Sequence, residues 1–173
     1  MKTQNPNRSS AFVNYLFQHC QQDKGFAARM RRGDNPATEY QCWETLAAFG
    51  VKLEYANNRL PFALIAAAVA RSEQTVNGEL KIGQAIACAF KEGNQSEQAK
   101  ARLRRLLACE DTEETCRILR PLLSLIQSRV KQSLDYAALL EDLCWFHENS
   151  NSKKARWAQQ FYHNPDEKNQ GEA

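Results

Sequence analysis

Apolar residues recur along this chain at the three- and four-residue spacing of helices, and no alternating stretch is long enough to predict a strand. Ser9 or Ser10 can cap a first helix that ends near Gln22. A short basic element is predicted over residues 26–32, and Gly33-Asp34-Asn35-Pro36 ends it.

Prolines mark the starts of the next two predicted helices, because proline fits the first helical turn, where its missing N–H is not needed. Pro36 predicts a helix that ends at Gly50, and Pro61 begins a buried, alanine-rich helix. The segment 71–81 after it is polar and carries Asn77-Gly78, a turn signal.

Polar capping residues delimit the helices of the second half of the chain. Ser96, Asp111 and Asp135 each stand just before an apolar-periodic segment and can cap it. We expect a kink or a break at Pro121, which falls inside a helical pattern. Asn149-Ser150-Asn151-Ser152 is expected to separate off a last amphipathic helix.

These elements predict an all-α protein, a compact bundle of about eight to nine helices with basic faces. A length of 173 residues and a hydrophobic content of 43% suit a protein with a buried core. We expect one helical domain over residues 10–163, as a single unit or as two packed lobes that meet near residues 71–81. Residues 1–9 are expected to be a flexible N-terminus and residues 164–173 a disordered tail.

The apolar segments and the cysteines do not indicate a membrane or secreted protein. The longest apolar run, over residues 60–70, is too short to span a bilayer. Residues 1–10 are polar and lack the apolar centre of a secretory leader, which predicts a cytoplasmic protein. The six cysteines lack the spacing of metal ligands, so we expect them to be reduced structural thiols.

The sequence motifs of common enzymes are absent. The chain has no glycine-rich phosphate loop, no His-Glu-x-x-His and no Gly-x-Ser-x-Gly, and its three histidines are scattered. On the predicted helices, carboxylates cluster at the cap over residues 111–114 and at Glu141-Asp142, which falls on a predicted solvent face. Acid/base catalysis needs one buried carboxyl group with a raised pKa, so neither pair fits it. We predict no catalytic residue, no metal site and no cofactor.

The strongest chemical signal is a basic stretch from Lys100 to Lys131. It holds eight basic residues and only four acids, which sit together at residues 110–114, and its surplus of four positive charges exceeds the +3 of the whole chain. The charges fall on predicted helices. Fixed rows of arginine, whose planar fork matches phosphate, are typical of proteins that hold phosphate groups.

Further basic residues near both ends of the chain extend this signal to four clusters. The predicted nucleic-acid-binding residues are Arg29, Arg31, Arg32, Lys100, Arg102, Arg104, Arg105, Arg117, Arg120, Lys153, Lys154 and Arg156. A single cluster is explained by a solvated helix face, but four clusters without interleaved acids favour a joint phosphate-binding surface. The chain has no base-reading motif and no aromatic ladder, so we expect salt-sensitive backbone contacts that are indifferent to sequence.

Two alternatives to a nucleic-acid-binding subunit stay open at this point. One is a helical scaffold whose basic faces bind acidic protein partners. The other is a helical enzyme with an unfamiliar site, which would need a deep pocket and a titratable group with a strongly shifted pKa.

Several segments, in their order and spacing, resemble one family. Residues 25–32 read Gly-x-x-Ala-x-Met-Arg-Arg, and residues 82–87 read Ile-Gly-Gln-Ala-Ile-Ala. The other similar segments are an aromatic-bearing helix at 40–49, an arginine–leucine helix pair at 102–107 and 116–123, and the segments 134–136 and 153–157. Together they cover most of residues 10–162 and resemble the CasB family, the small subunits of the type I-E CRISPR surveillance complex (Cascade).

The resemblance implies an all-helical, non-catalytic subunit in antiviral defence, present as two copies in its complex. The implied partners are the backbone and large subunits, the guide RNA and the target DNA, including its displaced strand. The implied role is to stabilise the R-loop without reading sequence. The positions carried over are Arg31, Arg32, Arg102, Arg104, Arg105, Arg117, Arg120, Lys153, Lys154 and Arg156.

Overall fold

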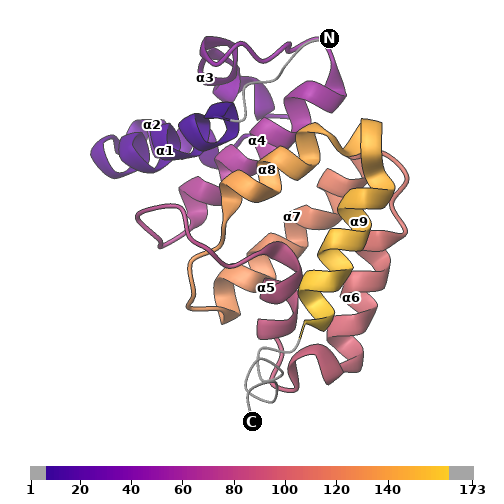
Figure 1. Ribbon diagram of the computed structural model, residues 1–173. Helices are drawn as coiled ribbons and strands as arrows, with labels where there is room; N and C mark the ends of the chain where they lie inside the picture. The colour runs from indigo at the N-terminus through magenta and orange to yellow at the C-terminus, as the bar shows by residue number, and fades with distance from the viewer. Residues whose placement is uncertain (1–6, 164–173) are drawn as a thin grey trace.

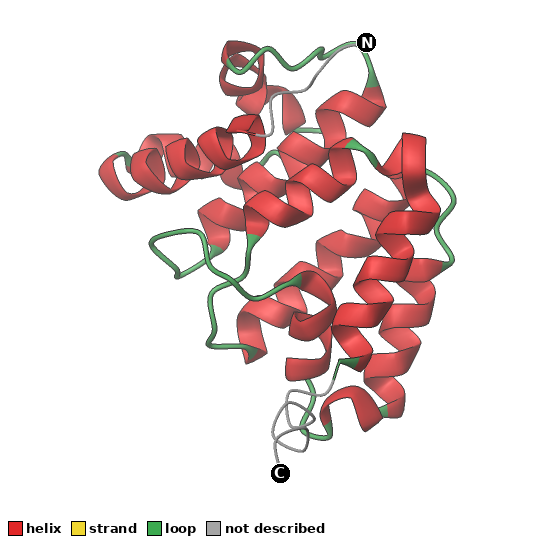
Figure 2. Ribbon diagram, viewed as in Figure 1, coloured by secondary structure: helices red, strands yellow, loops and turns green. Residues whose placement is uncertain are grey.

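The computed structural model describes residues 7–163, which fold into nine α-helices and two short 3₁₀ turns, η1 and η2, and confirm the predicted all-α bundle. Loops join the helices, and the described residues form no strand (Figure 2). The elements are α1 (Asn7–Gln22), α2 (Lys24–Arg31), η1 (Glu39–Cys42), α3 (Trp43–Ala48), α4 (Ala56–Arg71), α5 (Ile82–Cys88), η2 (Gly93–Gln95), α6 (Glu97–Leu107), α7 (Thr112–Arg129), α8 (Tyr136–Cys144) and α9 (Phe146–Tyr162). No helix within residues 7–163 is long and apolar enough to cross a membrane.

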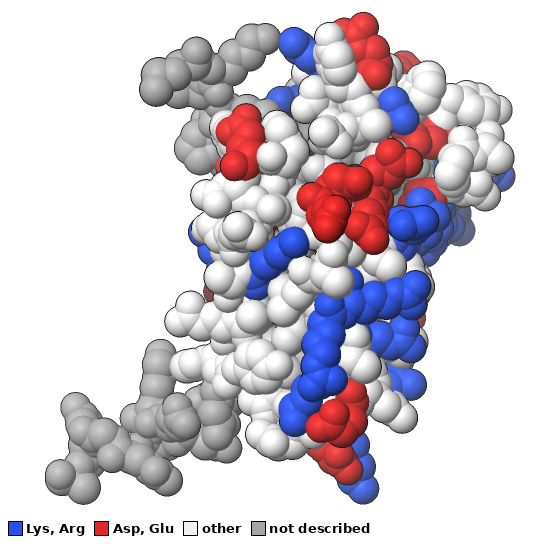
Figure 3. Space-filling view, turned by 90° about the vertical axis from the view of Figure 1, so that its right-hand side faces the viewer, with Lys and Arg blue, Asp and Glu red and all other residues white. Residues whose placement is uncertain are grey.

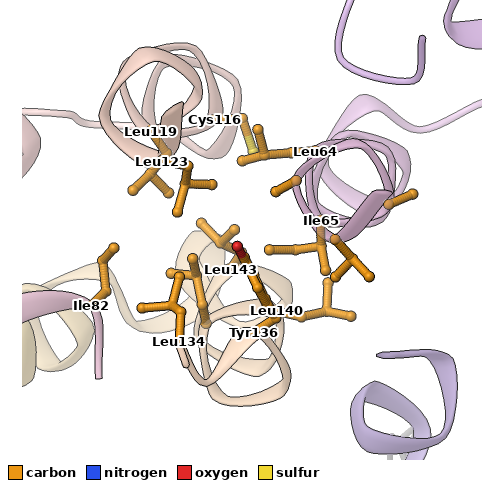
Figure 4. Packing of buried hydrophobic residues seen from close by; sticks show 14 of the residues in the cluster. Leu64, Ile65, Ile82, Cys116, Leu119, Leu123, Leu134, Tyr136, Leu140 and Leu143 are labelled. Atoms are coloured by element: carbon orange, nitrogen blue, oxygen red, sulfur yellow. The ribbon is translucent and has the colours of Figure 1, made fainter. Parts of the chain in front are cut away.

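Helix α4 is the centre of the hydrophobic core. All ten residues from Pro61 to Ala70 are buried, so this helix is enclosed on every side. Leu64 and Ile65 of α4 point toward side chains of α7 and α8, among them Leu123 and Leu140 (Figure 4). A helix that is apolar all round must be covered by its neighbours, and here α1, α2, α7 and α8 cover it.

The remaining helices extend the core in two directions from α4. Helices α1 and α2 lie side by side at one end of the molecule, and α5, α6 and α9 pack together at the other (Figure 1). The buried cluster is continuous from Phe12 in α1 to Phe161 in α9. The expected domain limits and the division near residues 71–81 stay predictions, and the expected tail at 164–173 lies outside the described residues.

The three predicted caps in the second half of the chain are confirmed. The side chains of Ser96, Asp111 and Asp135 accept hydrogen bonds from the backbone N–H groups at the third helical position of α6, α7 and α8, over 3.2, 2.7 and 2.9 Å. These bonds stabilise N–H groups that have no partner inside the helix.

Three predicted helix starts were wrong. Helix α1 begins at Asn7, before the predicted caps and within the segment expected to be flexible, and the Ser9 hydroxyl donates to Glu141 over 2.7 Å instead of capping. Pro36 lies in a turn, and the helical segment after it begins as η1. Helix α4 begins five residues before Pro61. Pro61 has no N–H to donate to the carbonyl of Asn57, so one helical hydrogen bond is lost. The helix tolerates this loss because Asn57 is exposed and water can satisfy its carbonyl.

Two predicted interruptions are smaller than expected. Helix α7 runs unbroken from Thr112 to Arg129 through Pro121. Because Pro121 is exposed, water can satisfy the carbonyl that the proline leaves without a partner. The break expected at residues 149–152 is confined to the backbone of Asn149, with φ −149° and ψ 53°, and both sides of it belong to α9.

A turn was expected at Asn77-Gly78. In the structure these two residues join the α4–α5 loop to the segment before α8 by hydrogen bonds. The Asn77 side chain accepts from the N–H groups of Tyr136 and Ala137, over 2.8 and 3.2 Å, and donates to Asp135 over 2.8 Å. The Gly78 N–H donates to the Leu134 carbonyl over 3.0 Å. A Cβ on Gly78 would lie 1.9 Å from the Ser133 carbonyl oxygen, so only glycine allows this approach.

Helices α5 and α9 also meet across a glycine. The Gly83 N–H donates to the Gln160 side chain over 3.1 Å. A Cβ at Gly83 would lie 2.1 Å from the Trp157 carbonyl oxygen and 2.6 Å from the Gln160 Cβ. The spacing of the two helix backbones therefore depends on the absence of a side chain at this position.

We predict that Gly83→Ala lowers the free energy of unfolding by about 2–3 kcal/mol, because α5 and α9 must separate to admit the methyl group. Urea denaturation monitored by circular dichroism measures this change. Gly25→Ala is the matched control, since Gly25 is helical, exposed and near only flexible side-chain atoms. An equal effect of both substitutions would contradict close packing at Gly83.

Candidate nucleic-acid interface

Helix α6 carries the arginines of the predicted set that have the fewest contacts with the rest of the protein. Its apolar face, with Leu103 and Leu106, is fully buried. The other faces carry three exposed arginines whose side chains form no hydrogen bond or ion pair with any described residue: Arg102, Arg104 and Arg105. Lys100 is half-buried and pairs with Glu97 over 3.3 Å, a weak i,i+3 contact.

Helix α7 adds two arginines one turn apart. Arg117 is exposed, and its guanidinium lies 4.0 Å from the Glu114 carboxylate at the edge of ion-pair distance. Arg120 is half-buried, and its Nε has no hydrogen-bond partner among the described residues. Arg117 lies away from the face of α7 that buries Cys116 and Leu119, whereas Arg120, one turn after Cys116, borders that face.

Basic side chains form a band on the face that carries α6 and α9. Figure 3 shows this face, with Lys and Arg in a band and acidic patches above and below it. Helices α6, α7 and α9 reach the same part of the molecule, because α6 packs on both of the others. The structure therefore brings three of the four predicted clusters together.

The cluster on α2 lies at the opposite end of the molecule (Figure 1). Its side chains contact their own surroundings: the Arg31 Nε donates to the Ala70 carbonyl over 3.1 Å, and Arg32 donates to Gln41 over 2.8 Å. The Arg29 guanidinium lies 5.9 Å from the centre of the Phe26 ring. Arg29, Arg31 and Arg32 are exposed, but they do not extend the band on α6 and α9.

The cluster on α9 is paired with an acid that sequence reasoning missed. Glu141-Asp142 was placed on a solvent face, and this was wrong, because Asp142 is buried. Its carboxylate accepts from Arg156 over 2.9 Å and from the Trp157 indole over 2.8 Å, and it lies 3.6 Å from the Lys153 ammonium. A buried tryptophan needs an acceptor for its indole N–H. A tryptophan on the apolar face of the last helix, Trp157, was therefore the sequence signal that a buried acceptor such as Asp142 lies nearby.

Other cations serve the fold. Arg71 forms a two-pronged ion pair with the buried Asp34, and Arg59 pairs with the buried Glu39. These pairs join the segment between α2 and η1, and η1 itself, to α4. Neither arginine belongs to the predicted binding residues.

The ion pair of Lys81 with Asp135 joins the loop before α5 to the cap of α8. Burial alone would raise the pKa of Asp135, but hydrogen bonds from Lys81, Asn77 and the Ala138 N–H outweigh it and hold the pKa below its ordinary value. The carboxylate is therefore charged at neutral pH.

Comparisons with known proteins decide the family. Residues 27–162 match the family described as CRISPR-associated protein Cse2. This chain belongs to the Cse2 family. The resemblance inferred from the sequence is thereby confirmed. No curated protein sequence matches the chain.

Two solved structures resemble this Cse2-family chain over almost its whole length. The crystal structure of CasB from M. ruber is similar with a TM-score of 0.75 and 27% identity, over 94% of this chain and 96% of that one. A chain of a structure titled "CRISPR RNA-guided surveillance complex" is similar with a TM-score of 0.70 and 20% identity, over 91% of this chain and 92% of that one. At 20% identity, this second similarity supports the shared fold alone.

The cysteines of this Cse2-family chain are free and resist ionisation. Burial raises the pKa of Cys20 to about 11, that of Cys42 to about 12 and that of Cys144 to about 12. A nucleophilic thiol needs a lowered pKa. These three thiols are therefore protonated at neutral pH and act as small apolar side chains.

We predict that the free energy of unfolding distinguishes the exposed arginines of α6 from the arginines that support the fold. Arg102→Gln, Arg104→Gln and Arg105→Gln should each change the free energy of unfolding by less than about 0.5 kcal/mol, as expected of exposed side chains without partners. Arg71→Gln should cost about 2 kcal/mol, because it leaves the buried Asp34 charge unpaired. Urea denaturation compares the four variants. A large loss at any α6 position would show that its arginine supports the fold.

Proposed function

We propose that this chain is a non-catalytic, nucleic-acid-binding subunit of a type I-E CRISPR RNA-guided surveillance complex, which acts in antiviral defence. It stabilises the R-loop of guide RNA and target DNA by contacts to the backbone that do not read sequence. Membership of the Cse2 family and the likeness to CasB from M. ruber support this assignment.

One observation carries the proposal: Arg102, Arg104 and Arg105 are exposed on α6, and none pairs with an acid among residues 7–163. Charged side chains that support a fold have partners, as Arg59 and Arg71 have here. Three free arginines on one short helix are available to an anionic ligand. Guanidinium groups bind phosphate through two parallel hydrogen bonds, which suits a nucleic-acid backbone.

The energetics of R-loops explain why such contacts matter. The RNA–DNA heteroduplex that forms is about as stable as the DNA duplex it replaces, so protein contacts to the backbones can tip the balance. Each phosphate that a cation neutralises releases counterions, so a few arginines acting together have a large effect. Phosphate contacts carry no sequence information, which suits a subunit that must serve every guide.

The partners follow from the same proposal. They are the backbone and large subunits of the complex, the guide RNA, the target DNA with its displaced strand, and a second copy of this chain. The chain acts in the cytoplasm and needs no cofactor. Its chemistry is binding, and the base pairing of the guide supplies specificity.

We predict that the purified chain binds a fluorescently labelled single strand of DNA with a Kd of about 1–100 µM, as is typical of sequence-independent binding. Arg102→Gln/Arg104→Gln/Arg105→Gln should weaken binding about tenfold or more and reduce the slope of log K against log salt by ~2, since each lost contact removes ~0.7. Fluorescence anisotropy at several salt concentrations measures both quantities.

The matched control is Lys52→Gln/Lys91→Gln/Lys131→Gln, which removes the same charge from three exposed lysines outside the predicted set. It should weaken binding much less than the α6 triple change does. Equal losses of affinity in the two triple variants would show that net charge alone explains the effect. If the folded wild-type chain does not bind at low salt, the arginines serve acidic protein partners and the scaffold alternative replaces the proposal.

A further inference from the structure

Asp142 lies at the contact of α8 and α9 and faces three side chains of α9. One carboxylate oxygen accepts from Arg156 over 2.9 Å and lies 3.6 Å from the Lys153 ammonium, and the other accepts from the Trp157 indole over 2.8 Å. The side chain of Asp142 is only 6% exposed. Its buried charge is therefore stabilised by these three neighbours.

The two cations of this group differ in their access to solvent. The Lys153 side chain is 13% exposed, and its ammonium faces Asp142. The Arg156 side chain is 53% exposed, but the contact with Asp142 holds one terminal nitrogen of its guanidinium. Lys154 differs from both, since its ammonium lies 5.9 Å from the centre of the Phe146 ring and forms no ion pair with a described residue.

This arrangement lowers the charge that α9 offers to a ligand. Lys153 and Arg156 carry two positive charges, but with Asp142 the group carries a net charge of +1. If a phosphate bound Arg156 or Lys153 instead, the buried carboxylate of Asp142 would lose a partner. The free energy of leaving this charge less well paired would oppose binding. The arginines of α6 incur no such cost, because they have no partner among the described residues to lose.

We infer that Asp142 is an internal counter-ion that competes with nucleic-acid phosphate for Lys153 and Arg156. It limits the affinity of the α9 side of the interface, so that α6 dominates binding. The inference rests on the proposed function. It gives this buried acid a role in tuning affinity beside its role in packing α8 against α9.

The first test compares Asp142→Asn with wild type in the anisotropy assay on single-stranded DNA. The asparagine side chain can still accept from the Trp157 indole, but it no longer holds the two cations by charge. We expect binding about three- to tenfold tighter and a salt slope steeper by ~0.7–1.4, one or two additional phosphate contacts. Glu73→Gln, which removes an exposed acid in the α4–α5 loop, should change the affinity less than about twofold.

The sign of the effect decides between two roles for Asp142. If it instead orients Arg156 toward phosphate, Asp142→Asn weakens binding although the net charge rises, and the inference is overturned. An effect no larger than that of Glu73→Gln overturns it as well.

A double-mutant cycle tests whether the effect runs through the two cations. In the background Lys153→Gln/Arg156→Gln, Asp142→Asn should no longer tighten binding beyond the Glu73→Gln control. Tightening that persists would assign the effect to charge at a distance and contradict direct competition.

If Asp142→Asn does not fold, two other measurements still test the inference. Arg156→Gln should weaken binding less than Arg102→Gln, because only Arg102 is free in the wild type, and the reverse order contradicts the inference. Lys153 should react with an amine-labelling reagent more slowly than the exposed Lys91. If wild type does not bind DNA, the proposed function fails, whereas fast labelling of Lys153 refutes its capture by Asp142 whether or not DNA binds.

Discussion

Burial of α4 around its whole circumference is the constraint on which the rest of the structure depends. Ten consecutive buried residues, Pro61 to Ala70, contain five alanines, whose small side chains let neighbouring helices approach closely. Burying them excludes water from an apolar helix and supplies a central part of the hydrophobic stabilisation. The helices packed around α4 turn their polar faces outward, and two of them, α7 and α8, in turn support α6 and α9, which carry the basic band.

Local patterns in the sequence predicted much of this fold. Ser96, Asp111 and Asp135 were identified as caps because a short polar side chain at that position has one main use. The inward faces of α6 and α7 followed from helical periodicity. Pro61 was a misleading signal because the preference of proline for the first turn is statistical. A helix tolerates one lost hydrogen bond near its start when the carbonyl that loses its partner is exposed, as at Asn57.

Contacts between distant residues could not be predicted. Asp142 sits in a polar dipeptide that reads as solvent-facing, and only the packing of α9 against α8 buries it. The same holds for Arg31, whose hydrogen bond to the Ala70 carbonyl requires α2 to lie beside the end of α4. The sequence therefore identified the charged residues, and tertiary packing sorted them into free ones, as on α6, and engaged ones, as on α9.

In the proposed function, the free arginines of α6 hold the R-loop open. The most direct measurement is the lifetime of the R-loop in a reconstituted surveillance complex that carries either the wild-type subunit or Arg102→Gln/Arg104→Gln/Arg105→Gln, with two guides of unrelated sequence. We expect both complexes to assemble equally and the R-loop to collapse about tenfold faster with the variant, for both guides alike. An unchanged lifetime, or a variant that no longer enters the complex, would contradict the proposed function.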